Sequence, residues 1–381
     1  MRIAFYAPLK APTHPVPSGD RRMARLLMAA LEAGGHHVTL ASTLRSWDDG
    51  RHPGRAERVA ALGARCADRL VARWRHEPPD LWFTYHLYHK APDWIGPAVA
   101  RHFGIPYVVA EASFAPKRAT GPFAAGHRAT EAAIRQAAAV VNLAGHDAEG
   151  VLPLLDHPGR LVRLRPFLDT RPFAAAADDR ARHRAALAAR HGLPLDAPWL
   201  LAVGMMRGGD KERSYAILAE AMRQLSPVPA RHLLIVGDGP ARSRIETLFG
   251  NGLDGRIHFL GQQTLSDLAA LYAAADLMVW PAVNEAYGMA LLEAQAAGLP
   301  VVAGRTGGVP DVVRDGVGGL LPPVGDPVAF AAAVESLLRD PGRRREYGEA
   351  ARRIAAADHD FSMAAHTLDG LVRRIVLTGM P

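Results

Sequence analysis

Two glutamates and a glycine are closely spaced in residues 284–297, whose sequence is NEAYGMALLEAQAA. Glu285 lies just ahead of an expected helix, Gly288 lies in its first turn, and Glu293 lies two turns inside it. A helix N-terminus has unpaired N–H groups and a partial positive charge, so it can bind an anion such as a phosphate. A nearby carboxylate can accept hydrogen bonds from sugar hydroxyls. The spacing alone leaves another interpretation open, in which Glu285 complements the helix dipole and Glu293 faces solvent.

Two cations lie in a loop farther up the chain. Residues 203–218 read VGMMRGGDKERSYAIL and follow an expected buried strand at residues 199–203, so that Arg207 and Lys211 come soon after a glycine. Two fixed cations can neutralise the negative charge of a diphosphate leaving group. The alternative is a solvated loop with two surface cations.

The first half holds an aromatic and basic segment at residues 81–94, LWFTYHLYHKAPDW. Aromatic rings stack on sugar faces, and histidine and lysine side chains can bind hydroxyl or phosphate groups. The segment begins with an expected strand, so we expect it to end at the carboxyl edge of a sheet, where ligands bind. The side chains that we predict to bind an acceptor are Tyr85, His86, His89 and Lys90. A core role is the alternative, above all for Trp82 and Phe83.

Strands and helices are expected to alternate in both halves of the chain, which indicates βαβ units and parallel sheets. A proline-containing break near residues 166–179 separates the two series, and the chain is expected to be helical from about residue 326 onward. We therefore predict an α/β protein of two Rossmann-like, doubly wound domains facing a central cleft. The domains are expected over residues 1–170 and 180–358.

The composition excludes several classes of protein. Of the 381 residues, 49% are hydrophobic and 22% are charged, so the chain can form large cores and is not mainly disordered. A single cysteine, Cys66, rules out an intramolecular disulfide framework. No uncharged apolar run reaches the roughly 18 residues that span a bilayer. The apolar start of the chain is too short for a signal peptide, so we expect a cytoplasmic protein.

The positive charge belongs to the first half of the chain. Residues 1–171 hold 23 Lys and Arg against 15 Asp and Glu, whereas residues 172–381 hold 22 against 23. This imbalance favours an anionic partner for the first half, which is a membrane surface, a phosphate-bearing substrate or nucleic acid. Of these three we predict no nucleic acid partner. General basicity of the composition is the alternative.

A basic helix is expected over residues 54–75. On a helical wheel, an apolar arc lies beside an arc of four arginines. Such a helix suits an anionic membrane, so we predict a salt-sensitive, peripheral contact with the inner face of the membrane. The alternatives are an ordinary helix packed on its sheet and a freely soluble protein. The apolar arc consists of Val59, Leu62, Cys66, Leu70 and Trp74, and the basic arc consists of Arg58, Arg65, Arg69 and Arg73.

A longer segment around the two glutamates resembles a known family. Residues 276–313 read DLMVWPAVNEAYGMALLEAQAAGLPVVAGRTGGVPDVV and closely resemble the donor-site segment of the retaining glycosyltransferases of family 4, which have the GT-B fold. The family's two glutamates, separated by seven residues, fall on Glu285 and Glu293. Residues 203–218 are similar to the family's diphosphate-binding loop, and residues 235–240, IVGDGP, resemble its next strand and loop.

The resemblance implies a GT-B protein that transfers a sugar, with retention of configuration, from a nucleoside-diphosphate sugar to a glycan or lipid-linked acceptor. It implies a place in cell-surface or exopolysaccharide assembly and no requirement for a metal or cofactor. Glu285 would hold the donor-sugar hydroxyls, and Arg207 and Lys211 would stabilise the departing diphosphate. The donor-binding residues implied are Gly19, Gly261, Gly288, Met289, Ala290 and Glu293, the last at the ribose.

Three positions depart from the family pattern. Met205 stands where an arginine is usual, and only Gly19 remains of a usual glycine pair. Glu111 follows the fourth strand, where a histidine is frequent, and we include Glu111 among the acceptor-binding residues.

The resemblance covers almost the whole chain and is strongest between about residues 199 and 338. The helix expected over residues 360–381 is similar to the one that crosses back onto the first domain in GT-B proteins. Two other functions on this fold stay open: a nucleotide-sugar isomerase or epimerase, and a non-catalytic protein that binds nucleotide sugars.

Overall fold

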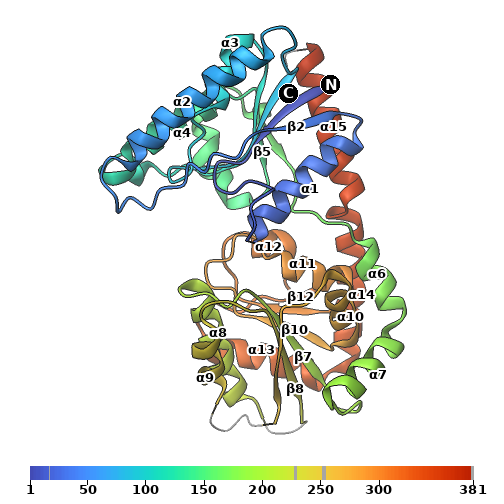
Figure 1. Cartoon of the computed structure of the whole chain (residues 1–381). Coiled ribbons are helices and arrows are strands. Elements are labelled where there is room, and N and C mark those ends of the chain that lie inside the picture. The colour runs from blue at the N-terminus through green and yellow to red at the C-terminus, as the bar shows by residue number, and fades with distance from the viewer. Residues whose placement is uncertain (17, 227–229, 251–254, 379–381) are drawn as a thin grey trace. The chain divides into compact units, whose positions relative to one another are not determined.

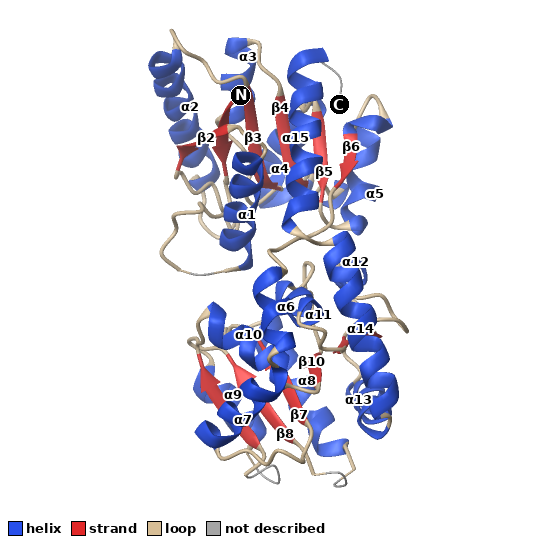
Figure 2. Ribbon diagram, turned by 90° about the vertical axis from the view of Figure 1, so that its right-hand side faces the viewer, coloured by secondary structure: helices blue, strands red, loops and turns tan. Residues whose placement is uncertain are grey.

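The computed structural model describes residues 1–381 apart from residue 17 and residues 227–229, 251–254 and 379–381. The chain divides into two compact units, each built around its own sheet (Figures 1 and 2). The first unit comprises Met1–Arg165 and Phe361–Pro381, and the second comprises Pro166–Asp360. Within the described residues, no helix is both long and apolar enough to span a bilayer.

The first unit contains a parallel sheet in the order β2-β1-β3-β4-β5-β6. A helix connects each strand to the next along the chain, because parallel neighbours need a crossover connection. The strands are β1 (Arg2–Tyr6), β2 (His37–Ser42), β3 (Leu81–Leu87), β4 (Tyr107–Ala112), β5 (Ala139–Asn142) and β6 (Leu161–Arg163). The helices are α1 (Gly19–Ala33), α2 (Arg55–Trp74), α3 (Gly96–Phe103), α4 (Ala124–Gln136), α5 (Ala148–Val151) and α15 (Phe361–Thr378).

The second unit repeats this plan with the parallel order β12-β11-β10-β7-β8-β9. Its strands are β7 (Trp199–Val203), β8 (His232–Val236), β9 (Ile257–Gly261), β10 (Leu277–Trp280), β11 (Val301–Ala303) and β12 (Gly319–Leu320). Its helices are α6 (Arg171–Asp178), α7 (Arg180–His191), α8 (Asp210–Gln224), α9 (Arg242–Phe249), α10 (Leu265–Ala274), α11 (Met289–Ala296), α12 (Val309–Val312), α13 (Pro327–Arg339) and α14 (Pro341–Asp358). Two parallel α/β sheets confirm the predicted fold class.

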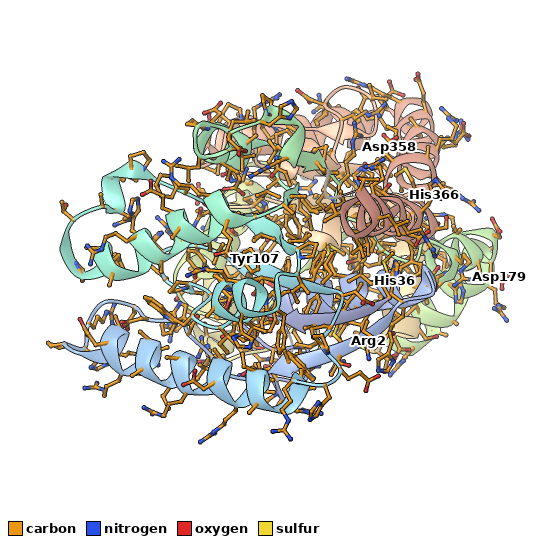
Figure 3. The ribbon with its side chains drawn as sticks, turned by 90° about the horizontal axis from the view of Figure 1, so that it is seen from above. Arg2, His36, Tyr107, Asp179, Asp358 and His366 are labelled. Atoms are coloured by element: carbon orange, nitrogen blue, oxygen red, sulfur yellow. The ribbon has the colours of Figure 1, made fainter. Side chains whose placement is uncertain are left out.

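The last helix, α15, packs on the first unit, as expected from the resemblance. Arg373 donates a hydrogen bond to the carbonyl of Gly34 at 3.1 Å, at the end of α1. His36 Nε2 lies 3.1 Å from Asp369 Oδ1 (His36 is labelled in Figure 3). A Cβ at Gly34 would come within 2.9 Å of Asp369 Cβ, so a glycine at this position allows the close approach of α15.

A buried carboxylate organises the core of the first unit. Asp93 is 3% exposed and accepts hydrogen bonds from Thr84 Oγ1 at 2.6 Å and from the Tyr107 hydroxyl at 3.1 Å. Tyr107 is labelled in Figure 3. The N–H groups of Ile95 and Gly96 each donate to it at 2.8 Å. Burial raises the pKa of Asp93 in spite of these four donors. Asp93 therefore ties the start of α3 to strands β3 and β4.

The apolar arc of α2 is mostly part of this core. Val59 and Leu70 are buried, and the Trp74 ring meets the Trp82 ring edge-on at a centroid distance of 6.4 Å. Leu62 is the exposed member, at 41%. This burial agrees with the alternative of an ordinary helix packed on its sheet, and a contact of the basic arc with a membrane stays a prediction. The four arginines of the basic arc, Arg58, Arg65, Arg69 and Arg73, are all exposed.

Candidate functional site

Loops at the carboxyl edge of the second sheet are held together through glycines. Gly237 and Gly239, in the turn after β8, have φ angles of 140° and 153°. A Cβ at either position would collide with a carbonyl of the loop after β7, at Gly204 or Met206. The N–H of Met206 donates to the Asp238 carbonyl at 2.9 Å. Because only glycine tolerates such close approach, the turn after β8 packs on the loop that carries Arg207 and leads to Lys211 in α8.

Lys211 and Glu285 form an ion pair at this edge. Lys211 lies in the first turn of α8, Glu285 lies in the loop after β10, and their side chains are 20% and 16% exposed. The indole N–H of Trp280 donates to the same carboxylate oxygen at 3.1 Å. Lys211 Nζ lies 5.1 Å from the centroid of the Trp280 ring. The structure thus brings together two of the three predicted catalytic residues and adds Trp280, the last residue of β10, which the sequence analysis did not single out.

The loop that carries Glu285 is tied to the start of α8. The N–H of Val283 donates to Ser214 Oγ at 3.0 Å, and Asn284 Nδ2 donates to Asp210 Oδ2 at 2.7 Å. Ala282 and Asn284 have positive φ angles of 56° and 51°, which non-glycine residues rarely adopt. Such strain persists only where surrounding contacts hold the backbone in place, and it is frequent at ligand sites.

The glycine pair after β11, Gly307 and Gly308, packs against the backbone of the loop that carries Glu285. A Cβ at Gly307 would collide with the carbonyl of Glu285, and a Cβ at Gly308 would collide with that of Ala286. Gly308 also donates its N–H to the Ala286 carbonyl at 2.6 Å. Gly288, with φ of 72°, is the N-cap of α11.

Met289 and Ala290 form the first turn of α11 and are half-buried. N–H groups at this end of a helix have no partner inside the helix, so they are available to an anion. Gly288, which we expected in the first turn of the helix, is instead its N-cap, and α11 begins at Met289.

Glu293 lies in the interior of the second unit. It is 3% exposed, and its carboxylate accepts a hydrogen bond from the Tyr272 hydroxyl of α10 at 2.8 Å. The interpretation of Glu293 as a solvent-facing residue is therefore wrong. A contact with a ribose stays a prediction.

The remaining residues predicted near the donor lie in the same set of loops. Arg207 is exposed and lies in the loop before α8. Hydrogen bonds from Asn284 and Arg213 lower the pKa of Asp210, and the charge of Arg207 lowers it further. Gly261 ends β9 with φ of 69°, and its carbonyl accepts the N–H of Gly237 at 2.9 Å.

A second cluster lies in the first unit, at the carboxyl ends of β3 and β4. His86 Nδ1 lies 3.2 Å from Asp20 Oδ1 and 3.8 Å from Glu111 Oε1. His86 and Glu111 both have left-handed backbones, with φ of 65° and 59°. Burial alone lowers the pKa of His86, but the carboxylates of Glu111 and Asp20 raise it to about 9. His86 is thus an imidazolium near neutral pH. Gly19 precedes Asp20 at the start of α1 and has open space at its Cβ position.

The predicted acceptor residues divide into two groups. Tyr85 is 1% exposed and packs inside the first unit, as do Trp82 and Phe83. His86, His89 and Lys90 are half-buried at the end of β3. The Tyr88 ring joins His86 to His89 with centroid distances of 5.1 and 5.4 Å. Exposure therefore favours the histidines and Lys90 as ligand contacts and disfavours Tyr85.

No group of three or more His, Cys, Asp or Glu side chains suited to a metal ion occurs within the part of the chain that the structure describes.

Comparisons with known sequences identify the second unit. Residues 197–340 match the family model of glycosyl transferases group 1. The D-inositol 3-phosphate glycosyltransferase of Salinispora arenicola is 38% identical over 206 residues, 52% of this chain and 46% of that protein. The alpha-D-kanosaminyltransferase of Streptomyces kanamyceticus is 32% identical over 263 residues, 68% of this chain and 66% of that protein. The chain spans about half the length of the inositol 3-phosphate relatives that it matches.

Solved structures share the fold over nearly the whole chain. Sucrose-phosphate synthase of Thermosynechococcus elongatus has a TM-score of 0.78 at 24% identity and covers 98% of both chains. Anabaena Alr3699/HepE in complex with UDP-glucose has a TM-score of 0.74 at 18% identity, over 98% of this chain and 99% of that one.

Proposed function

Because this chain belongs to the group 1 glycosyltransferases of family 4, we propose that it transfers a sugar from a nucleoside-diphosphate sugar to an acceptor hydroxyl, with retention of configuration. The observation that carries the proposal is the contact of Glu285 with Lys211 and Trp280. These side chains combine an acceptor for sugar hydroxyls with a cation for a diphosphate. A neighbour of the same fold, HepE, is described with UDP-glucose, which supports this class of donor.

In the proposed complex, Glu285 accepts hydrogen bonds from the donor sugar. Trp280 orients its carboxylate, and the carboxylate in turn holds Lys211 in place before the donor arrives. Lys211 then interacts with the diphosphate, where negative charge accumulates as the sugar–phosphate bond breaks. The acceptor attacks on the face from which the diphosphate leaves. No side chain acts as a nucleophile in this proposal.

The other donor contacts follow from the same loops. The N–H groups of Met289 and Ala290, beyond the Gly288 turn, would receive a phosphate, and exposed Arg207 would add a second cation. Glu293 would bind the ribose with its carboxylate oriented by Tyr272. Gly261 would allow the donor to approach the backbone of the second unit, and a donor contact at Gly19 stays a prediction.

Nucleotide sugars should stabilise the protein against heat. A ligand at 100 times its Kd stabilises the folded state by about 2.7 kcal/mol, so the true donor should give a clear rise in Tm over a panel of nucleotide sugars. Release of the free sugar or its transfer, followed with the best ligand, then separates an enzyme from a binding protein, and formation of an altered nucleotide sugar identifies an isomerase.

Chelation by EDTA should leave the rate of that reaction unchanged, since the proposed charge stabilisation uses Lys211 and backbone N–H groups. The proposal fails if no nucleotide sugar in the panel raises Tm.

The acceptor is proposed to be a glycan or a lipid-linked sugar used in cell-surface assembly, bound by the first unit. A lipid-linked acceptor would bring that unit to the inner face of the cytoplasmic membrane. The exposed arginines of α2, Arg58, Arg65, Arg69 and Arg73, support this placement, because each basic residue near an anionic surface contributes about 1 kcal/mol. With the apolar arc buried, attachment would be electrostatic.

Co-sedimentation with liposomes tests this attachment. We expect the protein to bind anionic vesicles at low salt and not to bind neutral vesicles. At about 0.5 M salt the Debye length falls to a few ångströms, so the protein should be released from the anionic vesicles. Reversal of Arg65 and Arg69 to Glu should abolish binding, whereas the matched reversal of Arg182 and Arg190, exposed on α7, should not. Equal binding of both double variants would contradict the proposal.

A further inference from the structure

Two cations of the first unit share one aromatic ring. Lys90 Nζ lies 5.3 Å from the centroid of the Phe123 ring, and the Arg118 guanidinium lies 5.7 Å from it. Both side chains are half-buried, and neither forms an ion pair with a carboxylate of the described residues. Neither charge is neutralised by a carboxylate within the described residues, so an anion bound beside this ring would meet two unpaired cations.

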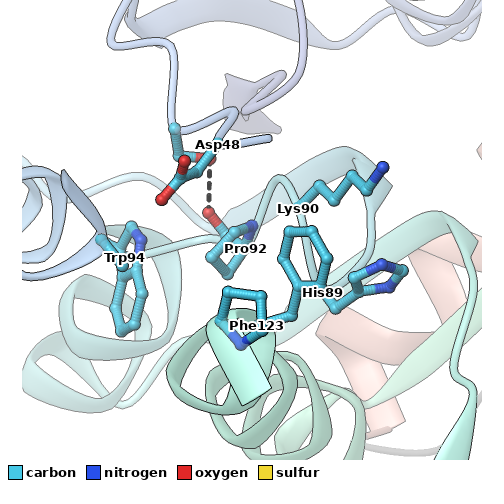
Figure 4. Close-up of a pocket in the computed structure, with 10 residues that line it drawn as sticks. Asp48, His89, Lys90, Pro92, Trp94 and Phe123 are labelled. Atoms are coloured by element: carbon cyan, nitrogen blue, oxygen red, sulfur yellow. Dashed lines mark hydrogen bonds between the residues drawn. The ribbon is translucent and has the colours of Figure 1, made fainter. Parts of the chain in front are cut away.

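Three loops hold these cations in place. Asp48 donates its N–H to the Lys90 carbonyl at 2.8 Å, and Ser46 Oγ donates to the Pro92 carbonyl at 2.7 Å. A Cβ at Gly50 would lie 2.9 Å from the Phe123 ring, so that loop is in direct contact with the ring. Figure 4 shows Lys90, Phe123 and Asp48 around the small pocket that results.

Asp48 is the acidic residue that lines the described pocket, and its carboxylate does not form an ion pair with Lys90 or Arg118. The Asp48 carboxylate accepts the N–H of Gly50 at 3.0 Å and lies 3.9 Å from Arg55, so its charge is shared with another guanidinium. His89 also lines the pocket, and its buried Nε2 atom has no hydrogen-bond partner among the described residues. Burial, with Arg118 and Lys90, lowers the pKa of His89 to about 4, so His89 is neutral and can donate one N–H to a ligand.

We propose that Lys90 and Arg118, with His89, bind an anionic group of the acceptor, namely a phosphate ester. This inference deepens the proposed function, because it assigns the ligand of this pocket to the acceptor. The Tyr88 ring connects His89 to His86, so the uncharged part of the acceptor would extend toward the cluster of Asp20, His86 and Glu111. The phosphate could belong to a soluble sugar phosphate or to a lipid-linked one, and the chemistry recognised is the same.

Calorimetry can test the site without the true acceptor. Inorganic phosphate and glycerol 3-phosphate are titrated at constant ionic strength with UDP at saturation, so that the proposed donor site is occupied, and glycerol is the uncharged comparison. We expect both phosphates to bind and glycerol not to bind. Lys90→Gln and Arg118→Gln should each weaken phosphate binding about tenfold, whereas Lys117→Gln, an exposed neighbour, should change it by less than about twofold.

Vesicles that contain phosphatidic acid distinguish the two sources of phosphate. If the wild type binds these vesicles and either Lys90→Gln or Arg118→Gln abolishes that binding, the ligand is lipid-linked. If the wild type binds glycerol 3-phosphate but not the vesicles, the ligand is soluble. The inference is overturned if phosphate fails to bind, or if Lys117→Gln weakens binding as much as the other two variants. UDP binding is measured first, in a separate titration without phosphate, so failure of the donor proposal is seen separately from failure of this site.

Discussion

Replacing Glu285 with glutamine is expected to lower kcat/KM for the best nucleotide sugar by about 100- to 1,000-fold, as the loss of a preorganised polar group in an active site commonly does. The amide keeps the size of the side chain, but it no longer pairs with Lys211 and is a weaker acceptor for sugar hydroxyls. The free nucleoside diphosphate should bind Glu285→Gln at least as tightly as the wild type, because a negative charge beside the diphosphate is removed.

Steady-state kinetics and calorimetry with the nucleotide sugar and the free nucleotide measure these two effects. Glu212→Gln is the matched control: Glu212 follows Lys211 directly but pairs with Arg244 at the surface, so its kinetics should match the wild type. If Glu285→Gln retains wild-type kcat/KM, Glu285 does not hold the donor sugar.

Lys211→Met should lower kcat about 100-fold and weaken binding of the nucleoside diphosphate by only about tenfold. Methionine keeps an apolar stem over the Trp280 ring but removes the charge. The effect on turnover should be larger, because negative charge on the leaving diphosphate is greatest in the transition state. Single-turnover rates and calorimetry separate the two quantities.

Arg244→Gln provides the control for the loss of a nearby surface cation. A raised KM with unchanged kcat in Lys211→Met would contradict a role for Lys211 in stabilising the leaving group. Because Lys211 and Glu285 are in contact, the double variant should lose less activity than the product of the single effects.

Local sequence patterns were sufficient for the fold class and the family. The alternation of strands and helices predicts two parallel sheets, and both are present. The resemblance of residues 276–313 to family 4 is confirmed. The close approach of Gly307 and Gly308 to the backbone of the Glu285 loop, in contrast, is seen only in the structure.

Only the tertiary structure decided which residues meet. Lys211 and Glu285 are 74 positions apart, and they come together because β7 and β10 are neighbours in the sheet, so the loops at their carboxyl ends lie side by side. His86 and Glu111 meet for the same reason, at the ends of neighbouring strands β3 and β4.

Burial also depended on long-range packing. A helical wheel shows that Trp74 belongs to an apolar arc, but not that Trp82, from β3, covers it. Likewise, the spacing of Glu285 and Glu293 along the chain does not reveal that Glu293 accepts a hydrogen bond from Tyr272 of the neighbouring helix α10. The strand and helix periods are set by the local backbone geometry of each element. Exposure and contact partners depend instead on the order of the strands in the sheet, which only the folded chain determines.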